Sequence, residues 1–159
     1  MSDASPEPGA PLAAYVIPRE QTLEGVLGFE LLETGPERAT ARFEVVDRVR
    51  QPLGLVHGGT YAALAETIVS NATFLAVYPD GMMATGMSNL TSFLRPVTEG
   101  SVHAEARRQH RGRTTWVWEI EFTDDGGRLC AVSRVTTAVR ELPASARPPR
   151  ADGSYAPGD

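Results

Sequence analysis

Gly54-Leu55-Val56-His57-Gly58-Gly59 leads into Thr60-Tyr61-Ala62-Ala63-Leu64-Ala65-Glu66, and this stretch decides the fold. From Thr60 to Tyr78 the chain is rich in Ala, Leu, Ile and Val and has few helix breakers. This pattern predicts a helix about 28 Å long, at 1.5 Å per residue. Most of its circumference is apolar, which is typical of a helix covered by other elements.

Segments with the two-residue alternation of β-strands lie on both sides of this helix. A short helical turn is expected over Leu23–Leu27, ended by Gly28. Strands are expected over Phe29–Glu33, Arg38–Val46, Met83–Leu94, residues 102–107, residues 115–122 and Arg128–Val139. Short turns join them, which indicates an antiparallel sheet with one covered face. A long central helix wrapped by a curved antiparallel sheet is the hot-dog fold, of class α+β.

Length and composition limit the organisation of the chain. Its 159 residues suit a single domain, expected over residues 20–142. Residues 1–19 and 143–159 are rich in proline and small polar residues, and we expect flexible tails there. The net charge of −5 argues against nucleic-acid or membrane partners. One cysteine, Cys130, and no signal-peptide pattern favour a cytoplasmic location.

The entry to the long helix is suited to negative charge. The first backbone N–H groups of a helix have no intrahelical acceptors, and the helix dipole is positive there. His57-Gly58-Gly59 precedes the helix, and glycine lets a ligand approach the main chain closely. The Gly58 N–H could therefore polarise a thioester carbonyl and stabilise an oxyanion. The alternative is that the two glycines only form a tight turn.

Glu66 is the candidate reactive group. It is the only acidic residue between Asp47 and Asp80, and we expect it to be buried in an apolar helix. A buried carboxylate is costly unless it is paired or functional, and no Lys or Arg lies three or four residues away. Ser70, at i+4, can donate a hydrogen bond to it. The alternative is a solvated glutamate without a role.

The spacing of Gly58 and Glu66 predicts how the subunits assemble. Eight residues along one helix separate them by about 12 Å. Reacting atoms must approach to about 3–3.5 Å, so one chain cannot bring both groups to the same thioester. We therefore expect a homodimer with two active sites at its interface.

The residues quoted above resemble the hot-dog thioesterases of the phenylacetic-acid-pathway and 4-hydroxybenzoyl-CoA thioesterase group. The closest resemblance is to the 4-hydroxybenzoyl-CoA thioesterase type that has a helix glutamate. The similarity runs from about Glu20 to Arg140. Its motifs are residues 36–41, Gly54-Leu55-Val56-His57-Gly58-Gly59, Ala63-Leu64-Ala65-Glu66, Thr91-Ser92-Phe93, Arg95-Pro96-Val97 and residues 127–133.

The resemblance implies an acyl-CoA thioesterase that releases free acid and coenzyme A, with an aromatic acyl group expected. Glu66 would be the catalytic carboxylate, as nucleophile or as general base on water. The Gly58 N–H would polarise the thioester, with a second hydrogen bond from Gln51. His57 would position the loop, and direct proton transfer by His57 is the alternative. Ser70 stands where close relatives have threonine.

The resemblance also implies the partners and the remaining site residues. Relatives need no metal or prosthetic group, and they are commonly homotetramers built as dimers of dimers. The basic segment Arg107–Arg113, expected at a turn between strands, could bind phosphate, because arginine offers a fork of donors. A solvated hairpin is the alternative. The residues assigned to substrate or coenzyme A are Gly59, Arg95, Arg113, Thr114 and Thr115.

Two other functions fit the same fold. A non-catalytic acyl-CoA sensor would use the same pocket, but it would need an effector or DNA-reading segment, and none is visible in the sequence. A hydratase would need a His–Asp pair in one active-site segment, and no aspartate is suitably spaced from His57. His103 and His110 are expected on the surface.

Overall fold

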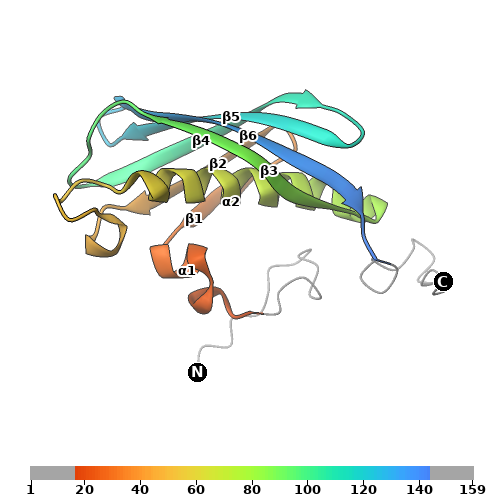
Figure 1. Ribbon diagram of the computed structural model, residues 1–159, viewed down its shortest axis with the longest axis horizontal. Coiled ribbons are helices and arrows are strands. Elements are labelled where there is room, and N and C mark those ends of the chain that lie inside the picture. The colour runs from red at the N-terminus through yellow and green to blue at the C-terminus, as the bar shows by residue number, and fades with distance from the viewer. Residues whose placement is uncertain (1–16, 144–159) are drawn as a thin grey trace.

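The central helix and the sheet that covers it are both present in the computed structural model, which describes residues 17–143 (Figure 1). The flexible tails expected from the sequence lie outside the described residues, apart from residues 17–19 and Pro143. The helical elements are η2 (Arg19–Gln21), α1 (Leu23–Leu27), η3 (Asp47–Val49), α2 (Gly58–Val77) and η4 (Tyr78–Asp80). The strands are β1 (Glu30–Thr34), β2 (Arg38–Glu44), β3 (Met82–Phe93), β4 (Ser101–Arg111), β5 (Thr115–Asp124) and β6 (Leu129–Glu141).

The six strands form one antiparallel sheet in the order β1-β2-β4-β5-β6-β3. In Figure 1 the sheet curves over α2, which follows β2 in the chain. The predicted α+β arrangement is therefore confirmed. Since β1 and β3 are the ends of the strand order, β3 pairs with β6 alone among the strands of residues 17–143.

The strand bounds differ from the predicted ones by one to four residues, and two differences concern the candidate site. Helix α2 begins at Gly58, two residues before the predicted start, because His57 adopts the extended N-cap conformation. Residues 107–111 of the basic segment belong to β4, so only residues 112–114 form the turn to β5. Burial alternates along β4 only as far as Ala106, and the pairing with β5 has an irregularity between Arg108 and His110. No helix within residues 17–143 is long and apolar enough to cross a membrane.

The core lies between α2 and the inner face of the sheet. In β5 the side chains at alternate positions are buried: Trp116, Trp118, Ile120 and Phe122. They share one buried cluster with Leu64 and Ile68 of α2. Burial of side chains this large stabilises the fold by about 1.5–3 kcal/mol each. The helix is thus held in place by the aromatic centre of the sheet.

One buried polar group ties α2 to this core. Trp118 Nε1 donates a hydrogen bond to Thr73 Oγ1 at 3.0 Å, and Thr73 Oγ1 donates to Val69 O at 2.7 Å. Thr137 Oγ1 lies 3.3 Å from the same hydroxyl. The Thr73 hydroxyl therefore satisfies the indole N–H inside an apolar core.

Thr73→Val should destabilise the protein, because it leaves the indole N–H of Trp118 buried without an acceptor. We expect the free energy of unfolding to fall by about 1–3 kcal/mol. Urea denaturation at fixed protein concentration measures the change. Thr67→Val, an equal change on a half-buried position of the same helix, is the control and should stay within about 0.5 kcal/mol. Equal effects of the two variants would contradict this role.

Candidate active site

The loop before α2 is fixed by His57. Its Nδ1 accepts a hydrogen bond from the Gly59 N–H at 2.8 Å, and the backbone N–H of His57 donates to Val49 O at 2.8 Å. A neutral imidazole whose Nδ1 is an acceptor carries its proton on Nε2. His57 is therefore engaged in holding the start of the helix, and Nδ1 is not available to accept a proton from a reactant.

Gly58 is the first residue of α2, and its N–H is directed out of the helix end. Within residues 17–143 no acceptor lies within hydrogen-bond distance of this N–H. A Cβ on Gly58 would come within 2.7 Å of Cζ of Phe93, so the tip of this ring lies against the glycine. The absence of a side chain at Gly58 therefore leaves room for the Phe93 ring of β3.

Glu66 lies on the surface of the chain, so the expectation that it is buried is wrong for a single subunit. The predicted hydrogen bond is present: Ser70 Oγ donates to Glu66 Oε1 at 2.8 Å. A Cβ on Gly86 of β3 would lie 2.9 Å from the same oxygen. The carboxylate therefore occupies the space left by the missing side chain of Gly86.

These contacts belong to one stripe of α2 that faces β3. Residues four apart on a helix lie on the same face, and the stripe consists of Gly58, Ala62, Glu66 and Ser70. The side chains or positions of β3 that meet it are Phe93 at Gly58, Asn89 at Ala62 and Gly86 at Glu66. Gly86, Asn89 and Phe93 were not among the site residues predicted from the sequence. Gly86 could have been found, because a glycine inside a strand often marks the close approach of another group.

A β-bulge in β3 makes this arrangement possible. Gly86 pairs with Thr137 and Ser88 pairs with Thr136, so Met87 has no partner in the ladder. In a regular strand, Gly86 and Asn89 would face opposite sides of the sheet, because they are three residues apart. The bulge takes up Met87, so both face α2.

Gln51 lies in the turn that precedes this stripe. Its N–H donates to Leu55 O, and its carbonyl accepts from the Gly54 N–H, both at 2.8 Å. Gly54 has a φ of 85°, a conformation that favours glycine. The side chain of Gln51 is half-buried and has no hydrogen-bond partner within the described part of the chain. Its amide can therefore serve a ligand.

The residues assigned to coenzyme A are not brought together by one chain. The Arg95 N–H donates to Cys130 O at one end of β6, whereas Thr114 O accepts from the Val139 N–H at the other end. Nine residues of strand separate these points by about 30 Å. Arg113 and Thr115 flank Thr114 and share its end of the sheet.

Most of the predicted phosphate-binding arginines have partners in the chain. Arg107 pairs with Glu105, and Arg108 pairs with Glu37 at 3.3 Å. The guanidinium carbons of Arg108 and Arg111 lie 4.7 and 5.1 Å from the centre of the Trp116 ring. The basic segment thus contributes to the structure of the sheet edge.

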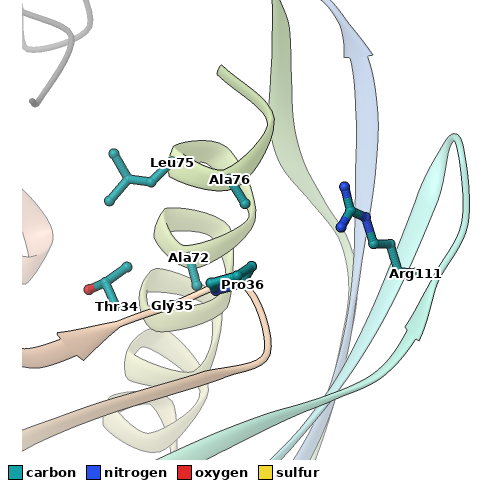
Figure 2. Close-up of a pocket in the computed structure, with 7 residues that line it drawn as sticks. All are labelled: Thr34, Gly35, Pro36, Ala72, Leu75, Ala76 and Arg111. Carbon is teal, nitrogen blue, oxygen red and sulfur yellow. The ribbon is translucent and has the colours of Figure 1, made fainter. Parts of the chain in front are cut away.

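A pocket of about 280 Å³ lies elsewhere on the molecule (Figure 2). It is bounded by the turn residues 34–36, by Leu75 and Ala76 of α2, and by Arg111. Leu75 follows Glu66 by nine residues. At 100° per residue this is about two and a half turns of the helix, so the two side chains point to opposite sides of α2. The pocket therefore opens on the opposite side of α2 from Glu66 and is not part of the candidate site.

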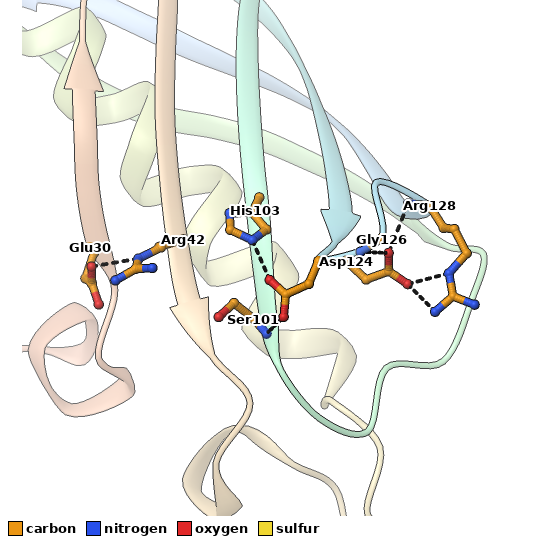
Figure 3. A network of polar contacts seen from close by, with 8 residues as sticks. Glu30, Arg42, Ser101, His103, Asp124, Gly126 and Arg128 are labelled. Carbon is orange, nitrogen blue, oxygen red and sulfur yellow. Dashed lines mark hydrogen bonds and ion pairs between the residues drawn. The ribbon is translucent and has the colours of Figure 1, made fainter.

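A second group of charged residues lies at the turn between β5 and β6 and on the adjoining part of β4 (Figure 3). His103 Nε2 lies 2.8 Å from Asp125 Oδ1, and this hydrogen bond lowers the pKa of Asp125. The backbone N–H and guanidinium of Arg128 lower the pKa of Asp124. These bonds hold the β5–β6 turn. His103 is a partly exposed residue, as expected, and it lies across the sheet from α2.

No group of three or more His, Cys, Asp or Glu suited to a metal ion occurs within residues 17–143.

Comparison with known proteins identifies the family. Residues 53–131 match the thioesterase superfamily. The proofreading thioesterase EntH of Cronobacter turicensis is 41% identical over 118 residues, which cover 74% of this chain and 85% of EntH. The chain belongs to the thioesterase superfamily. It is therefore a thioester-hydrolysing enzyme. The predicted thioesterase superfamily and hot-dog fold are confirmed, and the 4-hydroxybenzoyl-CoA type stays a prediction.

Solved structures of thioesterases share this fold. A variant of thioesterase PA1618 from Pseudomonas aeruginosa is 35% identical with a TM-score of 0.74, covering 78% of this chain and 89% of that one. Thioesterase HI1161 from Haemophilus influenzae is 37% identical with a TM-score of 0.72, covering 77% and 85%. The Escherichia coli PaaI protein of the phenylacetic acid degradation operon is 22% identical, with a TM-score of 0.66 over 75% of this chain and 84% of PaaI, and shows likeness of fold alone.

Gly86→Ala should lower thioester hydrolysis, because its Cβ would displace the Glu66 carboxylate from 2.9 Å. We expect kcat to fall by roughly ten- to a hundredfold, the effect of a misplacement of about 1 Å. Spectrophotometric detection of the released thiol measures it. Ser88→Ala, beyond the bulge on the other face of β3, is the control and should keep wild-type activity. A fully active Gly86→Ala would show that the close approach of β3 to Glu66 is not needed.

Proposed function

We propose that the protein hydrolyses an acyl-CoA to a free acid and coenzyme A, with Glu66 as the reactive carboxylate. The observation that carries this proposal is the position of the Glu66 carboxylate. It accepts a hydrogen bond from Ser70, lies against Gly86 of β3, and shares a face of α2 with Gly58. Two solved structures of relatives support it, because each is of a variant in which a residue of the same type as Gln51 or Glu66 was replaced. One is the PA1618 variant, in which a glutamine became alanine, and the other is a Staphylococcus aureus SAV0944 variant, in which a glutamate became alanine.

The chemistry follows from the two ends of the stripe. The Gly58 N–H donates to the thioester oxygen, and Gln51 supplies a second hydrogen bond as negative charge develops there. Glu66 attacks the carbonyl carbon, the C–S bond breaks, and the thiolate of coenzyme A leaves. Water then hydrolyses the mixed anhydride. In the alternative path, Glu66 removes a proton from water, which attacks directly. Neither path needs a metal or prosthetic group.

The site is shared between two subunits. Strand β3 is a 12-residue edge strand, and long unpaired edges favour pairing with another chain. Three of its large apolar side chains are exposed, Met87, Leu90 and Phe93, and so is Leu94 directly after it. Antiparallel pairing of two β3 strands, with the two-fold axis between Asn89 and Leu90, would set Phe93 of one subunit beside Gly86 of the other. That arrangement would bring Gly58 of one subunit towards Glu66 of its partner.

The same pairing of two β3 strands would also bring together the residues proposed to bind coenzyme A. It would turn the Arg95 end of one subunit towards the Thr114 and Thr115 end of the other. One coenzyme A could then contact residues that a single chain keeps about 30 Å apart. Gly59 and Arg113 complete the proposed substrate contacts. A homotetramer formed as a dimer of dimers extends this proposal.

The proposed acyl group is aromatic, as in the 4-hydroxybenzoyl-CoA type that the sequence resembles. Phe93 supports this, because its ring covers Gly58 and is 58% exposed. The centre of the Tyr61 ring lies 6.1 Å from that of Phe93. A flat acyl group bound at Gly58 would therefore meet an aromatic side chain. Offset or edge contacts between aromatic rings contribute about 0.5–1.5 kcal/mol beyond burial.

Two inactive variants should restore activity when they are combined in one dimer. Glu66→Gln removes the reactive carboxylate and should abolish most turnover while coenzyme A still binds. Gly58→Pro removes the N–H donor, and proline fits the first position of a helix. It should cost roughly a hundredfold or more in kcat. Co-expression of the two should recover up to about a quarter of wild-type activity, because a two-fold dimer then has one intact site.

Gly58→Ala is the matched control for Gly58→Pro, since it meets Phe93 in the same way but keeps the N–H. It should retain more activity than the proline variant. A mixture that stays inactive would show that the site does not span two chains. Near wild-type kcat of Glu66→Gln alone would overturn the proposed mechanism.

A panel of acyl-CoA substrates should separate aromatic from aliphatic acyl groups. We expect kcat/KM for benzoyl, hydroxybenzoyl or phenylacetyl groups to exceed that for medium-chain groups by about three- to tenfold, the value of one aromatic contact. Phe93→Leu should reduce this difference. Equal rates for both classes would refute the aromatic preference. Rates near background for every substrate would favour the acyl-CoA sensor.

A further inference from the structure

Asn89 of β3 contacts the turn of α2 that carries Glu66. Its Nδ2 donates a hydrogen bond to Ala62 O at 2.8 Å. In an α-helix the carbonyl of residue i accepts from the N–H of residue i+4, so Ala62 O is also the helical acceptor of the Glu66 N–H. The contact therefore falls on the peptide group to which the backbone of Glu66 is bonded.

Two hydroxyl groups fix the orientation of the Asn89 amide. Thr91 Oγ1 donates to Asn89 Oδ1 at 2.8 Å and lies 2.7 Å from Ser133 Oγ. A hydroxyl has one proton to donate, so Ser133 must be the donor to Thr91. Because Asn89 Oδ1 is occupied by this donor, Nδ2 is directed to Ala62. Ser133 is 4% exposed, and the chain of bonds thus starts in the rigid interior of the sheet.

The Asn89 bond adds a directional link between Glu66 and β3 to the apolar packing that holds α2 on the sheet. Its bond from Ser70 lies within α2 and does not fix the helix relative to the strand. Gly86, which borders the carboxylate, belongs to β3. Within residues 17–143 the Asn89 bond is the one side-chain hydrogen bond between α2 and β3. A shift of the helix along the strand would move Glu66 away from Gly86.

We propose that Asn89 is a positioning residue for Glu66, with Thr91 and Ser133 holding its amide. The proposal rests on the proposed catalytic role of Glu66. The Ser133–Thr91–Asn89–Ala62 chain sets where the carboxylate stands relative to the substrate. It does not touch the substrate itself. Its loss therefore lowers kcat and leaves KM unchanged.

The test compares variants that remove or keep single hydrogen-bonding groups. Asn89→Leu removes the donor at similar volume, and Asn89→Asp replaces the donor with an oxygen that repels Ala62 O. Both should lower kcat by about ten- to a hundredfold at unchanged KM. Thr91→Val should lower kcat in the same way, and Thr91→Ser, which keeps the hydroxyl, should restore it. Ser92→Ala, on the opposite face of β3, is the control.

The outcomes separate this proposal from the proposed function. Wild-type kcat in both Asn89→Leu and Thr91→Val would overturn the positioning role, as would a rise in KM alone. Thermal unfolding shows whether each variant is folded, and if Asn89→Leu is not, Thr91→Val against Thr91→Ser decides. Glu66→Gln is measured in parallel. If it is inactive while Asn89→Leu is fully active, only the positioning role fails, whereas an active Glu66→Gln removes the proposed function as well.

Discussion

The close approach of α2 to the edge strand β3 is the constraint on which the site depends. Two positions without a Cβ permit it: Gly58 accepts the tip of the Phe93 ring, and Gly86 accepts the Glu66 carboxylate. Each contact leaves less than 3 Å for an added methyl group. The two glycines therefore let one side chain from the opposite element fit between helix and strand at each end of the candidate site. The buried aromatic residues of β5 hold the helix from the other side.

The fold could be predicted because its signals are local. The apolar helix, the alternating strands and the turn at residues 124–127 each follow from neighbouring residues, and all of them are present in the structure. The start of α2 differed by two residues, since the N-cap role of His57 depends on its own side chain bonding back to Gly59. Histidine is not among the residues that favour this position.

The site could be predicted only in part, for a physical reason. Gly58, Glu66 and Ser70 lie on one helix, so their spacing alone showed that they share a face. The residues of β3 could not be placed in this way, because a bulge at Met87 reverses the alternation that assigns each side chain to a face. The exposure of Glu66 also escaped prediction, since an apolar helix sequence does not reveal that one of its faces borders the sheet edge.

The bulge at Met87 also decides where β3 can change in length. Met87 has no partner in the ladder, so loss of this one residue would restore regular pairing and leave Gly86 and Asn89 two residues apart on the same face. Loss of one residue between Asn89 and Phe93 would instead turn one of these two side chains away from α2, because every residue there is paired. The number of residues between Asn89 and Phe93 is therefore as constrained as their types, whereas the bulge can absorb a change of one residue.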